Sequence, residues 1–143
     1  MRDYQRQKVY NAERLHPQFV TNAAIAQLPT AEYYPLQCYV KNITEQDWFR
    51  SRFFIHTIHV KDGRGRRIAC GGNGTIKMPK WSRSPLVILH EIAHAVGLWQ
   101  SDKHGPKFCS HYLYLVYHQL GEQAYTDLKI QFKFFKVDFD DPI

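Results

Sequence analysis

Three polar side chains whose types suit metal chemistry interrupt an apolar segment in the second half of the chain. They are His90, Glu91 and His94, and every other residue from Leu86 to Val96 is apolar. A segment that is apolar all round is typical of a buried helix, and polar groups placed there need partners. Histidines four apart on a helix lie about 40° apart around its axis, so their imidazoles converge on one point. The spacing therefore predicts two ligands of one metal ion.

Glu91 lies about 100° around the helix from His90, which is near enough to reach a water held at an open coordination position. This is the H-E-x-x-H arrangement, in which the glutamate acts as general base. The helix is well signalled, because Ser84 suits the N-cap, Pro85 suits the first helical position and Gly97 offers a left-handed stop. We therefore expect a helix from Pro85 to Val96.

Two histidines do not complete a zinc site, so a third ligand must come from elsewhere in the chain. The first candidate is His104, because Gly105 and Pro106 predict the entry into a second helix that would hold it rigidly. We expect this helix to run to Leu120 and to end at Gly121. His111 is the second choice for the third ligand. A single histidine is more often a hydrogen-bonded core residue, but the three together predict a zinc site.

The segment from His90 to Phe108 resembles the SprT-like zinc metallopeptidases, in which H-E-x-x-H is followed by a histidine in an H-G-P-x-F segment. More of the chain is similar to a family of small metallohydrolases of unknown substrate. That similarity lies at Arg2-Asp3, Gln5-Arg6, 9–13 and 78–83. The resemblance implies an α+β, zincin-like fold with a small, mainly antiparallel sheet packed on the H-E-x-x-H helix and with further helices. SprT-like proteins often carry a four-cysteine zinc ribbon, whereas this chain has no C-x-x-C motif.

The same resemblance implies roles for individual residues. His90, His94 and His104 would bind Zn²⁺, Glu91 would be the catalytic base, and the substrate would be a protein or peptide. Two alternatives stay open at this point. The same site could hydrolyse a non-peptide amide or ester, or the chain could be a nucleic-acid-associated regulatory module with a structural zinc site. A structural site has no need of a base beside an open position, and this argues against the second alternative.

The composition indicates one domain, residues 1–143, that folds without disulfides. The three cysteines, Cys38, Cys70 and Cys109, are widely spaced and odd in number, which favours free, at least half-buried thiols and a reducing compartment. No apolar run reaches the roughly 18 residues that span a bilayer, and the polar N-terminal segment does not resemble a signal peptide. We therefore expect a cytoplasmic protein without a membrane partner; the sequence does not indicate its oligomeric state.

A basic segment precedes the predicted metal-binding helix. The net charge is +6, and seven of the nineteen lysines and arginines lie between Lys61 and Arg83. Single-stranded DNA could bind there, with Trp81 stacking on a base and with phosphates contacting the cations Arg64, Arg66, Arg67 and Lys80. A solvated hairpin kept soluble by its charge explains the same segment more simply.

The remaining pattern predicts helices around a sheet. We expect helices over 2–15 and 19–28 and a further short helix after Glu122, with the phenylalanines of the C-terminal segment packing on the sheet. Strands are predicted at 36–40, 53–60, 66–70 and 75–78. The strands 53–60 and 66–70 should form an antiparallel hairpin, and 75–78 should be an edge strand. The resemblance to zincins implies that this edge strand lines the cleft, although a plain sheet edge fits the same pattern. His56 and His59 would then point to opposite faces and could not bind one ion together.

Overall fold

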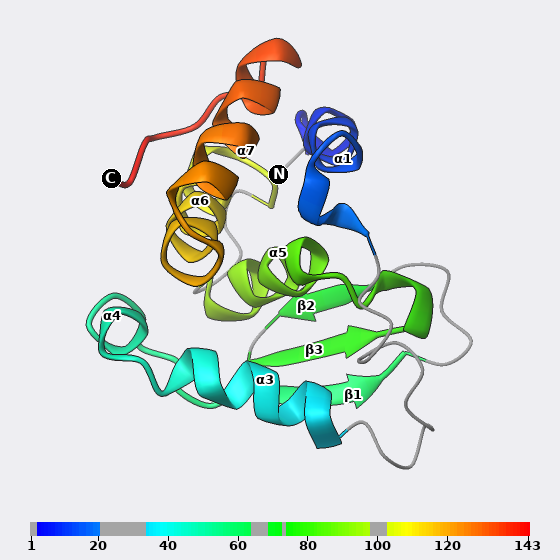
Figure 1. Ribbon diagram of the computed structural model, residues 1–143, viewed down its shortest axis with the longest axis vertical. Helices are drawn as coiled ribbons and strands as arrows, with labels where there is room; N and C mark the ends of the chain where they lie inside the picture. Colours follow the sequence, from blue (N-terminus) through cyan, green and yellow to red (C-terminus); the bar gives the residue numbers. More distant parts are fainter. Residues whose placement is uncertain (1–2, 21–33, 64–68, 73, 98–102) are drawn as a thin grey trace.

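The computed structural model describes residues 3–20, 34–63, 69–72, 74–97 and 103–143. The chain is α+β: a small sheet lies against helix α5, with the other helices around them (Figure 1). The described helices are α1 (Arg6–Arg14), α3 (Tyr34–Thr44), α4 (Asp47–Arg50), α5 (Pro85–Val96), α6 (Pro106–Leu120) and α7 (Glu122–Phe134), with short 3₁₀ turns η1 (Pro17–Phe19) and η3 (Lys80–Ser82).

The described sheet has three strands, β1 (His59–Asp62), β2 (Cys70–Gly72) and β3 (Thr75–Met78), in the order β1-β3-β2. β1 pairs with β3 in parallel and β2 pairs with β3 antiparallel, so the sheet is mixed and the prediction of a mainly antiparallel sheet was wrong. The predicted edge strand 75–78 is central instead. The reason is that local residue pattern identifies a strand but does not identify its partners.

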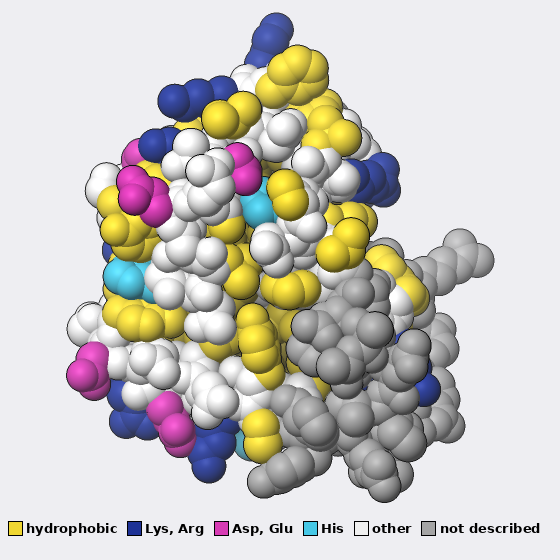
Figure 2. All heavy atoms as spheres, viewed as in Figure 1, with side chains coloured by type: hydrophobic (Ala, Val, Ile, Leu, Met, Phe, Trp, Pro, Cys, Tyr) yellow, Lys and Arg dark blue, Asp and Glu magenta, His cyan; other side chains and the backbone are white. Residues whose placement is uncertain are grey.

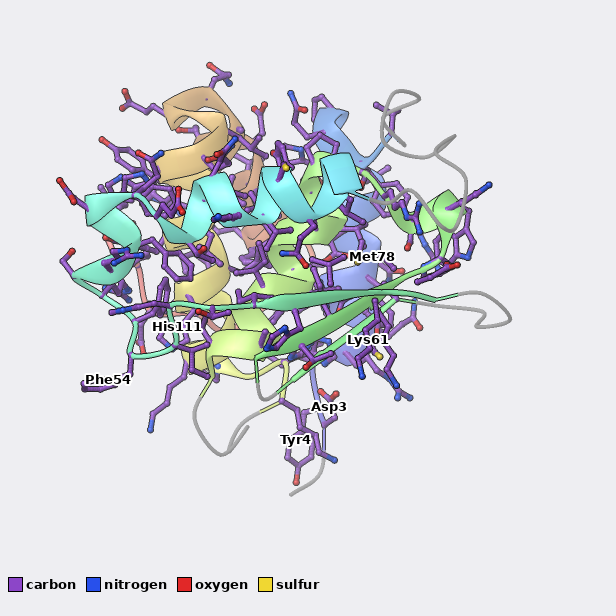
Figure 3. The ribbon with its side chains drawn as sticks, turned by 90° about the horizontal axis from the view of Figure 1, so that it is seen from below. Asp3, Tyr4, Phe54, Lys61, Met78 and His111 are labelled. Carbon is purple, nitrogen blue, oxygen red and sulfur yellow. The ribbon has the colours of Figure 1, made fainter. Side chains whose placement is uncertain are left out.

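One face of the sheet is covered by helices. Val60, Ile76 and Met78 alternate with more exposed neighbours and are buried. Helix α5 packs against β2 and β3, and α3 packs against β1. Figure 3, which shows the sheet nearly edge-on, places both helices on the same side. The buried face of the sheet therefore fixes α5, the predicted metal-binding helix, against its strands.

The segment predicted as a strand at 36–40 is part of helix α3. Leu36, Val40 and Ile43 are fully buried and recur at a spacing of four and three, which is the period of one helix face. The side chain of Gln37 accepts a hydrogen bond from the Val60 backbone N–H at 3.1 Å and donates to the Ile58 carbonyl at 3.2 Å. The Gln37 amide therefore hydrogen-bonds to backbone groups at the outer edge of β1 that would otherwise be available to a neighbouring strand.

The predicted strand 53–60 was also largely wrong, because β1 begins only at His59. Both faces of this segment were expected to be largely buried, but Phe54 is 86% exposed, and in Figure 3 its side chain points away from the protein. Of the predicted partner 66–70, residues 66–68 lie outside the described part of the chain, and β2 begins at Cys70 and pairs with β3.

The predicted helix 19–28 falls mostly on residues outside the described part of the chain. Its first residue, Phe19, ends the turn η1.

The C-terminal helices lie on the side of α5 away from the sheet. Helix α6 has the predicted bounds, and Gly121, with φ of +96°, ends it in a backbone conformation that favours glycine. Helix α7 packs against α6 and α1. The ring of Phe132 contacts Tyr112 of α6 and Phe139. Phe132 and Phe139 therefore pack among the helices and not, as expected, on the sheet, and Phe134 is exposed.

Two sequence expectations concern cysteines and membranes. Cys38 and Cys70 are half-buried, Cys109 is buried, and all three are free thiols, as predicted. Among the described helices, none combines the length and apolar character needed to cross a bilayer.

Candidate metal centre

Helix α5 begins as its sequence predicts. The Ser84 hydroxyl accepts a hydrogen bond from the Val87 backbone N–H at 3.1 Å, and Pro85 occupies the first helical position. At the other end, Gly97 has φ of −71°, so the expected left-handed stop was wrong. The last turn of the helix contacts the residue before β3, since the Ala95 carbonyl accepts a hydrogen bond from the Gly74 N–H at 3.0 Å.

The three predicted metal ligands lie together. His90 and His94 project from one face of α5, and His104 immediately precedes the first turn of α6. Their Nε2 atoms form a triangle with sides of 3.2 Å (His90 to His94), 3.1 Å (His94 to His104) and 3.3 Å (His90 to His104). Within the described residues they are the set whose geometry suits a metal ion.

The size of this triangle fits zinc. A Zn–N distance of about 2.0–2.1 Å in a tetrahedral site places two ligand nitrogens about 3.3–3.4 Å apart. The imidazoles are also in the form that binds a metal. Burial lowers the pKa of His90 to about 3, and burial followed by the neighbouring imidazoles lowers the pKa of His94 to about 2. Burial also lowers the pKa of His104. All three rings are therefore neutral at pH 7.

Two carboxylates orient two of the ligand rings. Asp3 Oδ2 lies 2.7 Å from His104 Nδ1, and Glu13 Oε1 forms a short contact with His90 Nδ1. Burial alone would raise the pKa of Asp3, but its hydrogen bond with His104 holds it below the usual value, so this carboxylate accepts a hydrogen bond from His104 Nδ1–H. The Nε2 lone pair of His104 is then directed at the centre of the triangle. Such outer carboxylates are a regular feature of histidine metal sites.

The N-terminal segment carries both carboxylates and also holds the backbone of the third ligand. The side chain of Gln5 is buried and donates hydrogen bonds to the His104 carbonyl at 2.9 Å and to the Asp138 carbonyl at 3.0 Å. These roles were not predicted from the sequence. There, Asp3 and Glu13 were noted only because they lie in segments that are similar to the family of small metallohydrolases. One signal was available: Glu13 lies four residues after Val9 on the buried face of α1, where an acidic side chain needs a partner.

Glu91 lies beside the triangle but is not part of it. Its Oε2 is 3.9 Å from His90 Nε2, and its side chain is buried. The backbone at Glu91 touches strand β2, since a Cβ added to Gly71 would lie 2.3 Å from the Glu91 carbonyl oxygen. A cavity of about 300 Å³ opens here, lined by the three histidines, Glu91 and the strand residues Cys70 and Gly71. A substrate in this cavity would contact the ligands and the candidate base together.

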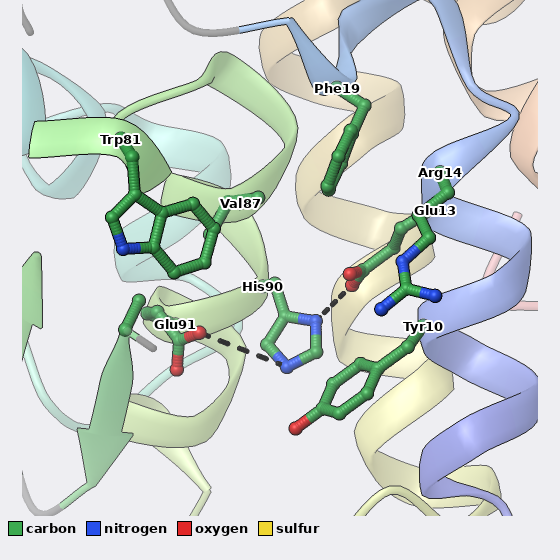
Figure 4. Close-up of a pocket in the computed structure, with 9 residues that line it drawn as sticks. Tyr10, Glu13, Arg14, Phe19, Trp81, Val87, His90 and Glu91 are labelled. Carbon is green, nitrogen blue, oxygen red and sulfur yellow. Dashed lines mark hydrogen bonds and ion pairs between the residues drawn. The ribbon is translucent and has the colours of Figure 1, made fainter. Parts of the chain in front are cut away.

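Tyr10 of α1 is a further polar side chain at this cavity. Its ring lies 5.9 Å from the His90 ring and 5.4 Å from the His104 ring, measured between centroids. Figure 4 shows its hydroxyl on the side of His90 that carries Nε2. Burial, together with the nearby acids Glu91 and Glu13, raises the pKa of Tyr10 to about 12. The hydroxyl therefore stays protonated and can donate a hydrogen bond.

The other histidines considered from sequence do not join the triangle. His111, the second choice, packs edge-on against Phe53 at 5.2 Å and lies outside the cluster. His59 is exposed on β1, and the exposed His56 lies 2.6 Å from the Phe53 carbonyl through Nε2. The expectation that neither binds the metal is consistent with these positions.

Of the proposed nucleic-acid contacts, Arg64, Arg66 and Arg67 lie outside the described residues, while Lys80 and Trp81 are exposed on η3. Arg83, which contributed to the basic run, is fully buried. It donates to the Met78 carbonyl at 3.0 Å and pairs with Asp62 at 3.4 Å, so it is not available to phosphate. Basic and acidic side chains are scattered over the face in Figure 2 without forming one patch. The binding of nucleic acid therefore stays a prediction from the sequence.

Comparisons with family models, curated protein sequences and solved structures found no match. The similarity to SprT-like metallopeptidases, read from the motifs, stays a prediction.

Proposed function

We propose that the protein is a zinc-dependent hydrolase that cleaves peptide bonds. The observation that carries the proposal is the triangle of Nε2 atoms from His90, His94 and His104 with a buried carboxylate, Glu91, beside it. Three neutral imidazoles leave one tetrahedral position for water, which is the arrangement of catalytic zinc sites. A structural site would be closed by a fourth protein ligand.

Each residue at the site has a chemical role in this proposal. Zinc supplies a Lewis acid that makes its bound water acidic near neutral pH. Glu91 accepts a proton from the attacking water and delivers it to the leaving amine. Tyr10 donates a hydrogen bond to the carbonyl oxygen as negative charge develops there. Asp3 and Glu13 hold His104 and His90 in the orientation that directs Nε2 inward.

The neighbourhood of the site supports a peptide over a smaller amide or ester. Strand β2 borders the cavity through Cys70 and Gly71, and within the described sheet it is an edge strand, paired only with β3. An exposed edge beside a catalytic site can bind an extended peptide by adding it as a further strand. The sequence assigned this role to 75–78; we assign it to β2, because β2 is the edge strand beside the cavity.

The test is the variant Glu91→Gln, which keeps the shape of the side chain and removes the base. Hydrolysis of an unstructured protein such as casein should fall by about 10²- to 10⁴-fold, whereas zinc content by elemental analysis should stay at one equivalent. Glu45→Gln is the matched control. Glu45 is an exposed residue directly after α3, so this variant should retain full activity. Equal activity of Glu91→Gln and wild type, or loss of zinc from Glu91→Gln, would contradict the proposed role.

A further inference from the structure

A second cavity, of about 310 Å³, adjoins the metal cavity. The two cavities share Tyr10, Ala69, His90 and Glu91 as lining residues, so they meet at the candidate catalytic groups. Figure 4 shows this second cavity between α1, η1, η3 and the first turns of α5. A molecule whose reacting bond lies in the metal cavity can therefore extend a side chain into the second one.

The chemistry of the second cavity differs from that of the first. Away from the shared residues it is lined mainly by the apolar side chains Phe19, Trp81 and Val87. Two residues with ionisable side chains complete the lining: Glu13, whose carboxyl group contacts His90, and Arg14, whose guanidinium lies beside Glu13 and Tyr10 in Figure 4. The cavity therefore offers mainly apolar surface and aromatic rings to a ligand, with one cation at its wall.

The distance between this cavity and the catalytic groups follows from the helix. Val87 lies three residues before His90 and four before Glu91, so all three share one face of α5. Three residues correspond to a rise of about 4.5 Å along the axis. Val87, which lines the cavity, thus lies nearly one helical turn from His90, a distance that the side chain of a residue next to the cleaved bond can cover.

We propose that this cavity is the specificity pocket of the enzyme, and that it selects peptides with a large apolar, preferably aromatic, side chain adjacent to the cleaved bond. The inference rests on the proposed zinc hydrolase function. Trp81 and Phe19 form opposite walls of the pocket in Figure 4 and would enclose an aromatic ring between them. Trp81, which is 53% exposed in the free protein, would be partly covered by the bound side chain.

Hydroxamates test the pocket independently of catalysis, because their head group binds zinc and their substituent can be varied. Acetohydroxamate, 3-phenylpropanohydroxamate and the monohydroxamate of succinic acid are titrated calorimetrically into zinc-loaded protein. We expect the phenyl compound to bind at least about 10-fold more tightly than acetohydroxamate, and more tightly than the acidic compound, whose carboxylate could contact only Arg14. Equal affinities for the phenyl and methyl compounds would contradict the proposed specificity pocket without contradicting the proposed metal site. Failure of the protein to bind zinc would overturn the proposed function and this inference with it.

Two variants locate the binding to the pocket. Val87→Phe fills the cavity from α5 and should reduce the phenyl preference to within about 2-fold, while zinc content and acetohydroxamate affinity stay unchanged. Phe19→Ala removes one wall from outside α5 and should reduce the preference by about 5- to 10-fold even if Val87→Phe does not fold. Phe54→Ala is the matched control, since this phenylalanine is exposed and does not line the cavity. Unchanged preference in Phe19→Ala, or an equal loss in Phe54→Ala, would show that the ring binds elsewhere.

Discussion

Gly71→Ala should disturb both the fold and the site, because no side chain fits between β2 and α5. An added Cβ would lie 2.3 Å from the Glu91 carbonyl oxygen and 3.0 Å from its carbonyl carbon. Both are backbone atoms, so no rotamer change relieves the contact. The strand and the helix must separate by roughly 0.7 Å before the closest contact reaches even 3.0 Å. Overpacking of this kind costs about 1–3 kcal/mol.

The expected loss of stability is measurable. For a chain of 143 residues, each kcal/mol corresponds to roughly 3–5 °C in Tm, so Gly71→Ala should lower Tm by about 3–15 °C. The same displacement moves the backbone of Glu91 relative to a substrate held along β2. Misplacement by about 1 Å can reduce the rate about 10²-fold, so hydrolysis should fall by more than the loss of folded protein accounts for. Scanning calorimetry and the casein assay below the transition measure the two effects separately.

Gly97→Ala provides the matched control for this prediction. Gly97 ends the same helix, has an ordinary φ of −71°, and an added Cβ there would lie 3.5 Å from its nearest neighbours. Its replacement should change stability by no more than about 0.5 kcal/mol. If Gly71→Ala and Gly97→Ala had the same Tm and activity, the close packing of β2 on α5 would not be what positions Glu91.

Three further predictions concern the ligands. His104→Ala should lose zinc by elemental analysis and His111→Ala should keep it; the reverse result would reassign the third ligand. Burial raises the pKa of Glu13 to about 8, so its carboxyl group contacts His90 in the neutral form at pH 7. Glu13→Ala, which removes this contact, should weaken zinc binding by about 10- to 100-fold in a chelator competition, and unchanged affinity would show that the contact does not support the metal site. Burial lowers the pKa of His90 to about 3 and of His94 to about 2, below the unfolded value, so the unfolded state binds more protons in acid. Stability of the zinc-free protein should therefore be retained above pH 6.5 and decline as the pH falls from there towards 3 in urea titrations, and a flat profile would show that these rings are not buried.

The parts of the molecule that the sequence predicts well are those specified by residues close together in the chain. Helix α5 is an example, since the cap at Ser84, the proline after it and the spacing of His90 and His94 all lie within eleven residues. Helix α6 and its end at Gly121 are another. Their signals need no information about distant partners.

The errors arose where distant contacts decide the structure. The short segment around Leu36 fits a strand or a helix equally well, and only its packing on β1 selects the helix. The position of 75–78 within the sheet depends on which strands pair with it, and β1 pairs in parallel from a distant segment. The carboxylates of Asp3 and Glu13 could not be assigned to particular histidines, because no local spacing relates the start of the chain to its second half.

The attachment of the metal ligands to the N-terminal segment has a consequence for how the protein is made. Glu13 and His90 are 77 residues apart, Asp3 and His104 are 101 apart, and Gln5 and Asp138 are 133 apart. At a synthesis rate of about 5–20 residues per second, the N-terminal helix leaves the ribosome roughly 4–20 s before the histidines that it orients. During that interval its buried face, including the carboxylate of Glu13, has no native partner. The fully oriented metal site can then form only after His104 has been synthesised, and an ion bound there would connect the segment from Asp3 to Glu13 with helices made later.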